Sequence, residues 1–113
     1  MQITVEELEA YLSKLYRGRV SDQSLFMKLI EEIGEVAEIL NKFSGRKKAD
    51  SDDLKAELGM ELADVIHYVV AIAAVNGLDL NDIILEKDKK ASSKYNRDIN
   101  MEQFALERRT SKE

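Results

Sequence analysis

Five carboxylates in two short segments are the residues whose types and spacing could do chemistry. Glu31, Glu32 and Glu35 form the pattern E-E-x-x-E, and Glu61 and Asp64 form the pattern E-x-x-D. Residues three or four apart share one face of an α-helix. Aliphatic residues surround both patterns, so each is predicted to lie on a helix, beside an apolar stripe.

The local sequence supplies almost no positive charge to these carboxylates. No Lys or Arg lies between Lys28 and Lys42, or between Lys55 and Lys87. Buried carboxylates without a partner either take up protons or find a cation. We expect the two acidic faces to meet around a hard divalent metal, and oxygen ligands favour Mg²⁺ or Mn²⁺ over zinc or copper.

Two plainer interpretations stay open. The first acidic segment could simply be the solvent face of an amphipathic helix, which applies best to Glu38. The carboxylates of the second segment could pair with a Lys or Arg from another helix or subunit.

Capping and breaking residues predict a mostly helical chain. Thr4 and Glu7 make a capping-box pattern, Ser21 or Asp22 can begin a second helix, and Asn76-Gly77 is a good helix end. The expected helices run from Thr4 to about Tyr16, Ser21 or Asp22 to about Phe43, Asp53 to Asn76 and Asp79 to about Tyr95, with a further segment (MEQFALERR) after Asn100 and a loop at residues 44–53.

The third predicted helix has almost no polar face. From Leu58 to Val75 it is aliphatic on every side and close to membrane-spanning length. It contains Glu61, Asp64 and His67, which are unfavourable in a bilayer. We therefore expect it to be buried in a protein core or in a subunit interface.

The composition limits the possible classes of protein. The 113 residues contain 44% hydrophobic and 35% charged residues, no Pro, no Cys and five Gly, with a net charge of −5. This predicts one soluble all-α domain over residues 1–113, with a peripheral tail from about residue 100. It excludes disulfides and a glycine-rich phosphate loop, and it speaks against binding to nucleic-acid polymers. The acidic N-terminus does not resemble a signal peptide, so we expect a cytoplasmic protein that does not bind membranes.

The two acidic patterns together resemble the MazG-like all-α nucleoside triphosphate pyrophosphohydrolases. The stretches EEIGEVAEIL and ELADVIHYVVAIA look like the two central helices of that family, and NGLDLNDIILEKDKK looks like its next turn and fourth helix. The resemblance covers residues 22–97. It implies a four-helix-bundle-like fold assembled as a homodimer or homotetramer.

The resemblance also implies an activity. A nucleoside triphosphate would be hydrolysed to the monophosphate and pyrophosphate with Mg²⁺ (or Mn²⁺), as in the removal of unwanted nucleotides. Glu32, Glu35, Glu61 and Asp64 match the metal ligands of the family. Glu31 matches the first glutamate of the signature, where it would hold a further ion or orient the attacking water.

Two further groups are candidates for substrate contacts. Lys94, Asn96 and Arg97 are similar to the basic and amide cluster with which the family holds phosphate or sugar. They could equally be a solvated basic helix end, favoured by the helix dipole. Apolar and aromatic residues near Leu25 and Phe26 are expected to form the base pocket.

His67 introduces a different possibility. With Asp64 it makes D-x-x-H, a spacing similar to that of ferritin-like dimetal helices. We expect instead that His67 packs in the protein with a satisfied ring nitrogen. A ferritin-like metal protein and a non-catalytic helical interaction module are the alternatives to the enzyme.

Overall fold

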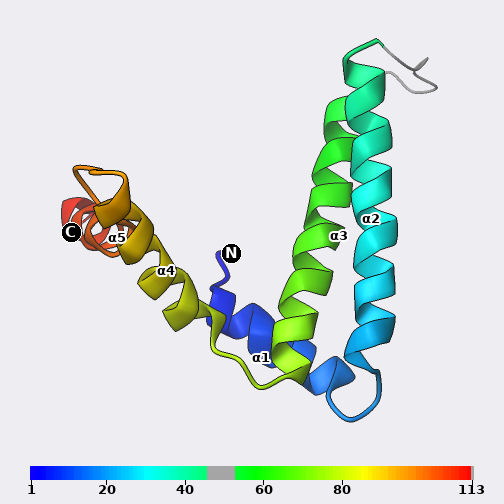
Figure 1. Ribbon diagram of the computed structural model, residues 1–113, viewed down its shortest axis with the longest axis horizontal. Helices are drawn as coiled ribbons and strands as arrows, with labels where there is room; N and C mark the ends of the chain where they lie inside the picture. The colour runs from blue at the N-terminus through cyan, green and yellow to red at the C-terminus, as the bar shows by residue number, and fades with distance from the viewer. Residues whose placement is uncertain (46–52, 113) are drawn as a thin grey trace. The chain divides into compact units, whose positions relative to one another are not determined.

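The computed structural model describes residues 1–45 and 53–112, and every element in these ranges is an α-helix (Figure 1). The prediction of an all-α fold is confirmed. The predicted loop at 44–53 lies mostly outside the described residues. The five helices are α1 (Val5–Tyr16), α2 (Asp22–Phe43), α3 (Leu54–Val75), α4 (Leu80–Lys94) and α5 (Met101–Lys112).

The helices begin where the capping residues predict. The Thr4 hydroxyl accepts a hydrogen bond from the Glu7 backbone N–H at 3.0 Å, and the Glu7 carboxylate accepts one from the Thr4 N–H at 2.9 Å, which completes the capping box. The side chains of Ser21, Asp53 and Asp79 cap α2, α3 and α4, each by accepting a hydrogen bond from the backbone N–H three residues further along. The end of α5 differs from the prediction: the helix continues to Lys112, three residues beyond the predicted end at Arg109.

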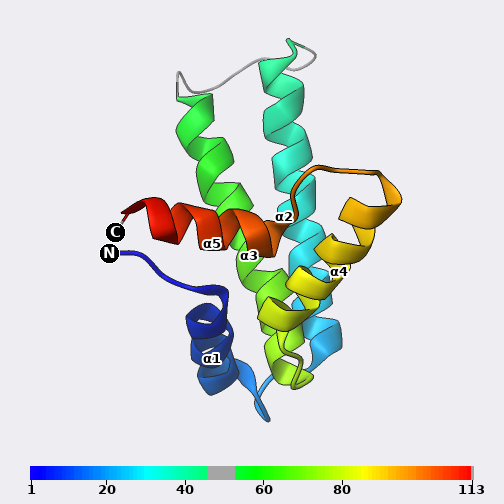
Figure 2. The same ribbon diagram turned by 90° about the vertical axis from the view of Figure 1, so that its left-hand side faces the viewer.

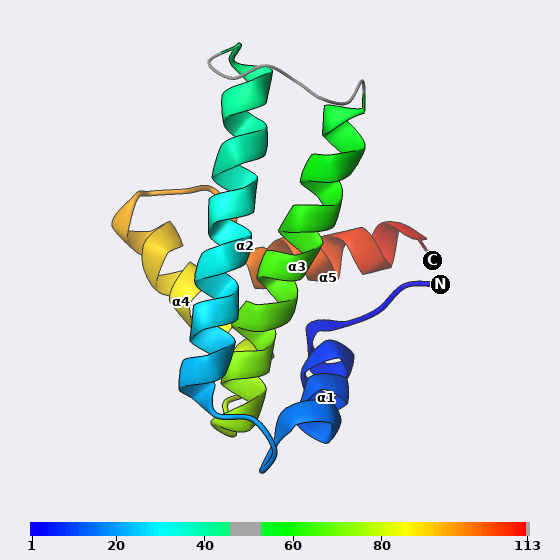
Figure 3. The ribbon, with the colours of Figure 1, turned by 90° about the vertical axis from the view of Figure 1, so that its right-hand side faces the viewer.

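The chain forms two compact units, residues 1–78 and the residues from Asp79 onward. In the first unit, α2 and α3 lie side by side as an antiparallel hairpin, as Figures 1 and 3 show. Helix α1 packs against the C-terminal half of α3. The buried apolar residues of this unit are Leu12, Leu25, Leu29, Ile39, Val70, Ala71, Ala73 and Ala74.

A hydrogen bond ties α1 to α3. The Tyr16 hydroxyl lies 2.8 Å from His67 Nε2. The His67 ring also makes edge contacts with the rings of Tyr16 and Tyr68, with centroids 5.7 Å and 4.9 Å apart. This confirms that His67 packs with a satisfied ring nitrogen, and it speaks against the ferritin-like alternative.

Within residues 1–78, much of the apolar surface of α2 and α3 stays exposed, so the core of this unit does not provide the burial expected for α3 in a protein core or in a subunit interface. On α3, Leu62, Ile66 and Val69 are 44% to 55% exposed. The core of unit one reaches only the last turns of α3, where small alanines let α1 approach. Of the described helices, α3 alone is long and apolar enough to cross a membrane by length and composition.

The second unit is a helical pair. Lys89 Nζ lies 2.6 Å from the Glu102 carboxylate, and the Asp88 carboxylate accepts a hydrogen bond from the Met101 N–H at 2.6 Å. The turn between α4 and α5 is visible in Figure 2. These contacts hold the start of α5 against the last turns of α4.

Replacing Tyr16 with Phe tests the link between α1 and α3. The change removes the hydroxyl that satisfies His67, so it should lower the free energy of unfolding by about 1 kcal/mol. That corresponds to a Tm lower by about 4 to 8 °C in a domain of this size. Thermal unfolding followed by circular dichroism measures it. The control is Tyr11→Phe, since Tyr11 is 58% exposed and should tolerate the change; equal effects of the two would contradict the role of the bond.

Candidate metal centre

The α2–α3 hairpin brings three of the predicted ligands together. One carboxylate oxygen each from Glu32, Glu61 and Asp64 lies within 4.8 Å of the other two. Glu32 comes from α2 and the other two from α3, so the two acidic segments meet across the hairpin. Three oxygen donors at this spacing can hold a hard divalent cation.

Glu35 also reaches this group. Hydrogen bonding to Glu35, and then to Glu32, together with burial, raises the pKa of Glu61 to about 8. Two carboxyl groups can share a hydrogen bond only if one of them carries a proton. In the metal-free protein at neutral pH, Glu61 is therefore the group that holds this proton.

Several carboxylate oxygens here are buried without a hydrogen-bond partner. Among the described residues these are Oε2 of Glu32, of Glu57 and of Glu61. Burying such an oxygen unpaired is costly, and a cation would remove the cost. An all-oxygen donor set with orphaned atoms fits Mg²⁺ or Mn²⁺ and does not fit a soft metal.

A cavity of about 340 Å³ adjoins the cluster and shares Glu35 and Glu61 with it. Its lining residues are Glu35, Glu38, Ile39, Lys42, Glu57, Met60 and Glu61. Glu38, predicted to face solvent, is exposed and lines this cavity as well. Glu57 was missed because it lies outside both motifs, although its spacing of four residues from Glu61 places it on the same helix face.

Glu31 is not brought into the cluster. Its carboxylate lies 3.3 Å from Lys28 Nζ, and the two side chains are 62% and 60% exposed. The hydrogen bond to Glu31 raises the pKa of Lys28. This outward pairing follows from helical geometry, because Glu31 is displaced by about 100° from Glu32 around α2.

Lys94, Asn96 and Arg97 gather at the end of α4, in the second unit. Lys94 Nζ and Arg97 Cζ lie 5.4 Å and 5.7 Å from the centroid of the Tyr95 ring. Arg97 also lies 3.8 Å from the Asp88 carboxylate. Asn96 has a φ of 52°, a conformation that Asn adopts more readily than most residues, so its position has a local structural reason.

A second cavity, of about 580 Å³, occurs at the start of α2. It is lined by Asp22, Gln23, Phe26, Met27 and Ile72. Leu25, expected in a base pocket, is instead buried in the core. Phe26 and Glu35 are about 180° apart around α2 at 100° per residue, so within one chain this cavity opens on the side of the hairpin away from Glu35.

The raised pKa of Glu61 predicts how stability depends on pH in the metal-free protein. The folded value of about 8 exceeds the ordinary value of 4.5, so between them the folded state binds more protons than the unfolded chain. This contribution to stability is complete below the lower value and is lost as pH rises through the higher one. Glu61→Gln keeps a neutral side chain and should remove the loss. Urea unfolding in chelator from about pH 5 to about pH 9 measures it.

The exposed Glu86→Gln variant is the control for that experiment, since Glu86 pairs with Lys90 at the surface of α4, far along the chain from the acidic motifs. If Glu61→Gln and Glu86→Gln showed the same pH slope as the unmodified chain, Glu61 would not hold the proton.

Comparisons with known proteins agree with this geometry. Residues 20–97 match the MazG nucleotide pyrophosphohydrolase domain. The chain is 32% identical over 92 residues to the protein YpjD of Bacillus subtilis (strain 168), covering 80% of this chain and 78% of YpjD. It is 31% identical to iMazG from Vibrio DAT 722, whose crystal structure it matches with a TM-score of 0.64 over 84% of this chain and all of that one. The chain belongs to the MazG nucleotide pyrophosphohydrolase family.

Proposed function

We propose that this protein hydrolyses a nucleoside triphosphate to the monophosphate and pyrophosphate in a reaction that requires Mg²⁺ and also accepts Mn²⁺. The observation that carries the proposal is the convergence of Glu32, Glu61 and Asp64 within 4.8 Å, with two of their oxygens buried and unpaired. A surface that only bound another helix would have no need of such a cluster. Membership of the family supports a nucleotide as the substrate.

Glu32, Glu35, Glu61 and Asp64 would hold the metal. When bound, divalent cations neutralise the triphosphate and polarise the phosphorus under attack. The four side chains fix the position of that charge because they come from two packed helices. Attack at the α-phosphorus is the reaction of the family.

Glu31 is proposed to orient the attacking water or to hold a further ion. Its exposed ion pair with Lys28 must open for either role. Exposed pairs of this kind contribute at most about 1 kcal/mol, so substrate binding can replace the contact at little cost.

Lys94, Asn96 and Arg97 are proposed to contact the phosphate or the sugar. Two cations around one aromatic ring, beside an amide, suit a polyanionic ligand that carries a flat base. Removal of unwanted nucleotides from the cytoplasmic pool is the proposed role. A net charge of −5 supports the absence of nucleic-acid polymers and anionic membranes as partners.

Self-association is part of the proposal. Phe26, Ile33 and Leu40 repeat every seven residues along one face of α2 and are 46% to 51% exposed. Leu62 and Ile66 of α3 are exposed as well, and exposed apolar faces of this kind often mark protein–protein interfaces. A homodimer or homotetramer would cover it.

Pyrophosphate release from a panel of nucleoside triphosphates tests the enzymatic proposal. With Mg²⁺, the unmodified chain should release pyrophosphate, whereas Glu32→Gln and Asp64→Asn should each lower the rate by a factor on the order of 100 or more, because each removes a metal-binding oxygen. Glu86→Gln is the matched control and should stay active. A folded chain inactive on the whole panel would favour a non-catalytic interaction module instead.

Ile66→Glu tests self-association. A charge placed on the exposed apolar face should be costly in an interface and should yield monomers in sedimentation equilibrium, with helical content unchanged. Ile3→Glu is the control, because Ile3 is also exposed but lies outside the α2–α3 hairpin. A monomeric unmodified chain, or an oligomer that tolerates Ile66→Glu, would exclude this face.

A further inference from the structure

We propose that Glu57, which lies outside both acidic motifs, is a metal-binding residue of this site. It would hold a divalent cation together with Glu35 and Glu61. The inference rests on the proposed metal dependence and extends it, because it adds a ligand that the family signature does not contain.

The position of Glu57 on α3 is the first observation that supports its role as a metal ligand. Glu57 precedes Glu61 by four residues on α3, so the two side chains lie on one helix face, and both line a cavity together with Glu35 of α2. The side chain is half-buried, and its Oε2 is buried without a hydrogen-bond partner among the described residues. An unpaired, buried carboxylate oxygen either destabilises the folded protein or is bound by a group, such as a cation, that the protein chain does not provide.

The second supporting observation is the cavity of about 340 Å³ next to Glu57. It joins Glu57 and Glu61 of α3 to Glu35 of α2, so carboxylates reach it from both helices. Its volume is several times the roughly 30 Å³ that one water occupies in the liquid. A cation with part of its water shell therefore fits between these side chains.

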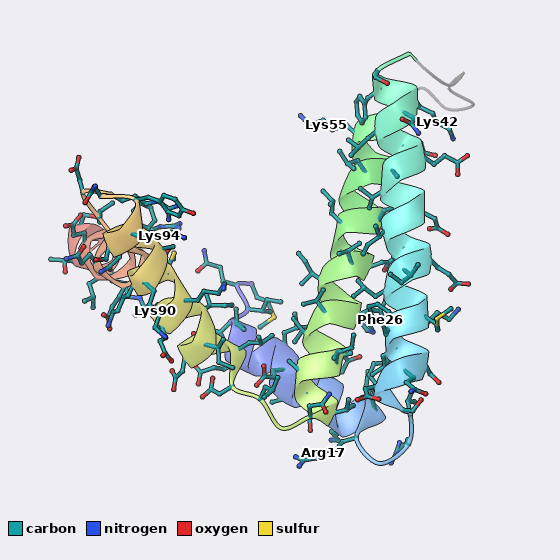
Figure 4. All side chains as sticks on the ribbon, in the orientation of Figure 1. Arg17, Phe26, Lys42, Lys55, Lys90 and Lys94 are labelled. Atoms are coloured by element: carbon teal, nitrogen blue, oxygen red, sulfur yellow. The ribbon has the colours of Figure 1, made fainter. Side chains whose placement is uncertain are left out.

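The third supporting observation is the excess of acidic side chains among the residues that line this cavity. Its lining residues include four carboxylates and one ammonium group, that of Lys42, near the loop end of the hairpin (Figure 4). Acidic groups therefore outnumber basic groups among the residues that line the cavity. A divalent cation would remove this excess, and the buried Ile39 keeps water away from one part of the cavity lining, where electrostatic attraction is stronger.

A role in structure alone is the competing explanation. Glu57 could serve as a counter-charge to Lys42, which lines the same cavity. In that case Glu57 would stabilise the metal-free fold and contribute nothing to metal binding. The two roles predict opposite effects of the same substitution, so one experiment separates them.

Manganese titration of the full chain is the direct test. Binding is followed by calorimetry and by the loss of the free Mn²⁺ electron paramagnetic resonance signal. Glu57→Gln should bind fewer Mn²⁺ ions, or bind them about 10-fold more weakly or worse. Glu57→Asp, which keeps a carboxylate, should lose less than Glu57→Gln. Glu86→Gln is the control and should bind as the unmodified chain does.

Thermal unfolding with and without Mg²⁺ is the second readout. Without metal, Glu57→Gln should unfold at the same or a higher temperature, since it removes an unpaired buried charge, and Mg²⁺ should raise its Tm by less than it raises that of the unmodified chain. A lower metal-free Tm with an undiminished Mg²⁺ effect would show a structural role and overturn the inference. Unchanged Mn²⁺ binding by Glu57→Gln would also overturn it, whereas an unmodified chain that binds no Mn²⁺ would overturn the proposed function as well.

Discussion

Repulsion between carboxylates packed across the α2–α3 hairpin is the constraint on which this structure depends. Glu32, Glu61 and Asp64 bring oxygens within 4.8 Å of one another, and Glu61 relieves part of the repulsion by keeping a proton to about pH 8. The helices stay together because apolar burial on both sides of the cluster, at Leu29 and Ile39 among others, offsets what remains. The hairpin thus holds charges that would otherwise drive its two helices apart.

The same hairpin has two chemically different sides. Around α2, Glu35 and Phe26 are about 180° apart, so the acidic cavity and the exposed apolar stripe face in opposite directions. This division lets one pair of helices serve two purposes in the proposed enzyme. Ions and phosphates would be held on one side while a second copy of the chain covers the other, and neither would displace the other.

Local signals in the sequence were enough to predict the helices and the meeting of the two acidic segments. Capping at Thr4 and Ser21 depends on hydrogen bonds a few residues away, so it can be read without the fold. Which side of α2 faces α3 could not be read, because packing between the two helices sets it. This packing turns Glu32 toward α3 and leaves Glu31, about 100° away around α2, at the surface. Whether a core or a subunit interface buries α3 could not be read from its sequence either, because that depends on what packs over Leu62 and Ile66, which stay exposed within residues 1–78. The position of Glu57 beside the acidic cluster could have been predicted from the sequence, because Glu57 precedes Glu61 by four residues and so lies on the same helix face.

The absence of lysine and arginine from the middle of both acidic segments also has a physical explanation. A fixed cation between Glu32 and Glu61 would neutralise the site permanently and would occupy the space that a metal needs. A proton on Glu61 neutralises the empty site only in part, and it can leave when a stronger positive charge arrives. A site neutralised by a removable proton is tolerable when empty and remains available to a divalent cation. For a site that is to bind a divalent cation, glutamates without a fixed Lys or Arg partner are therefore better suited than buried ion pairs.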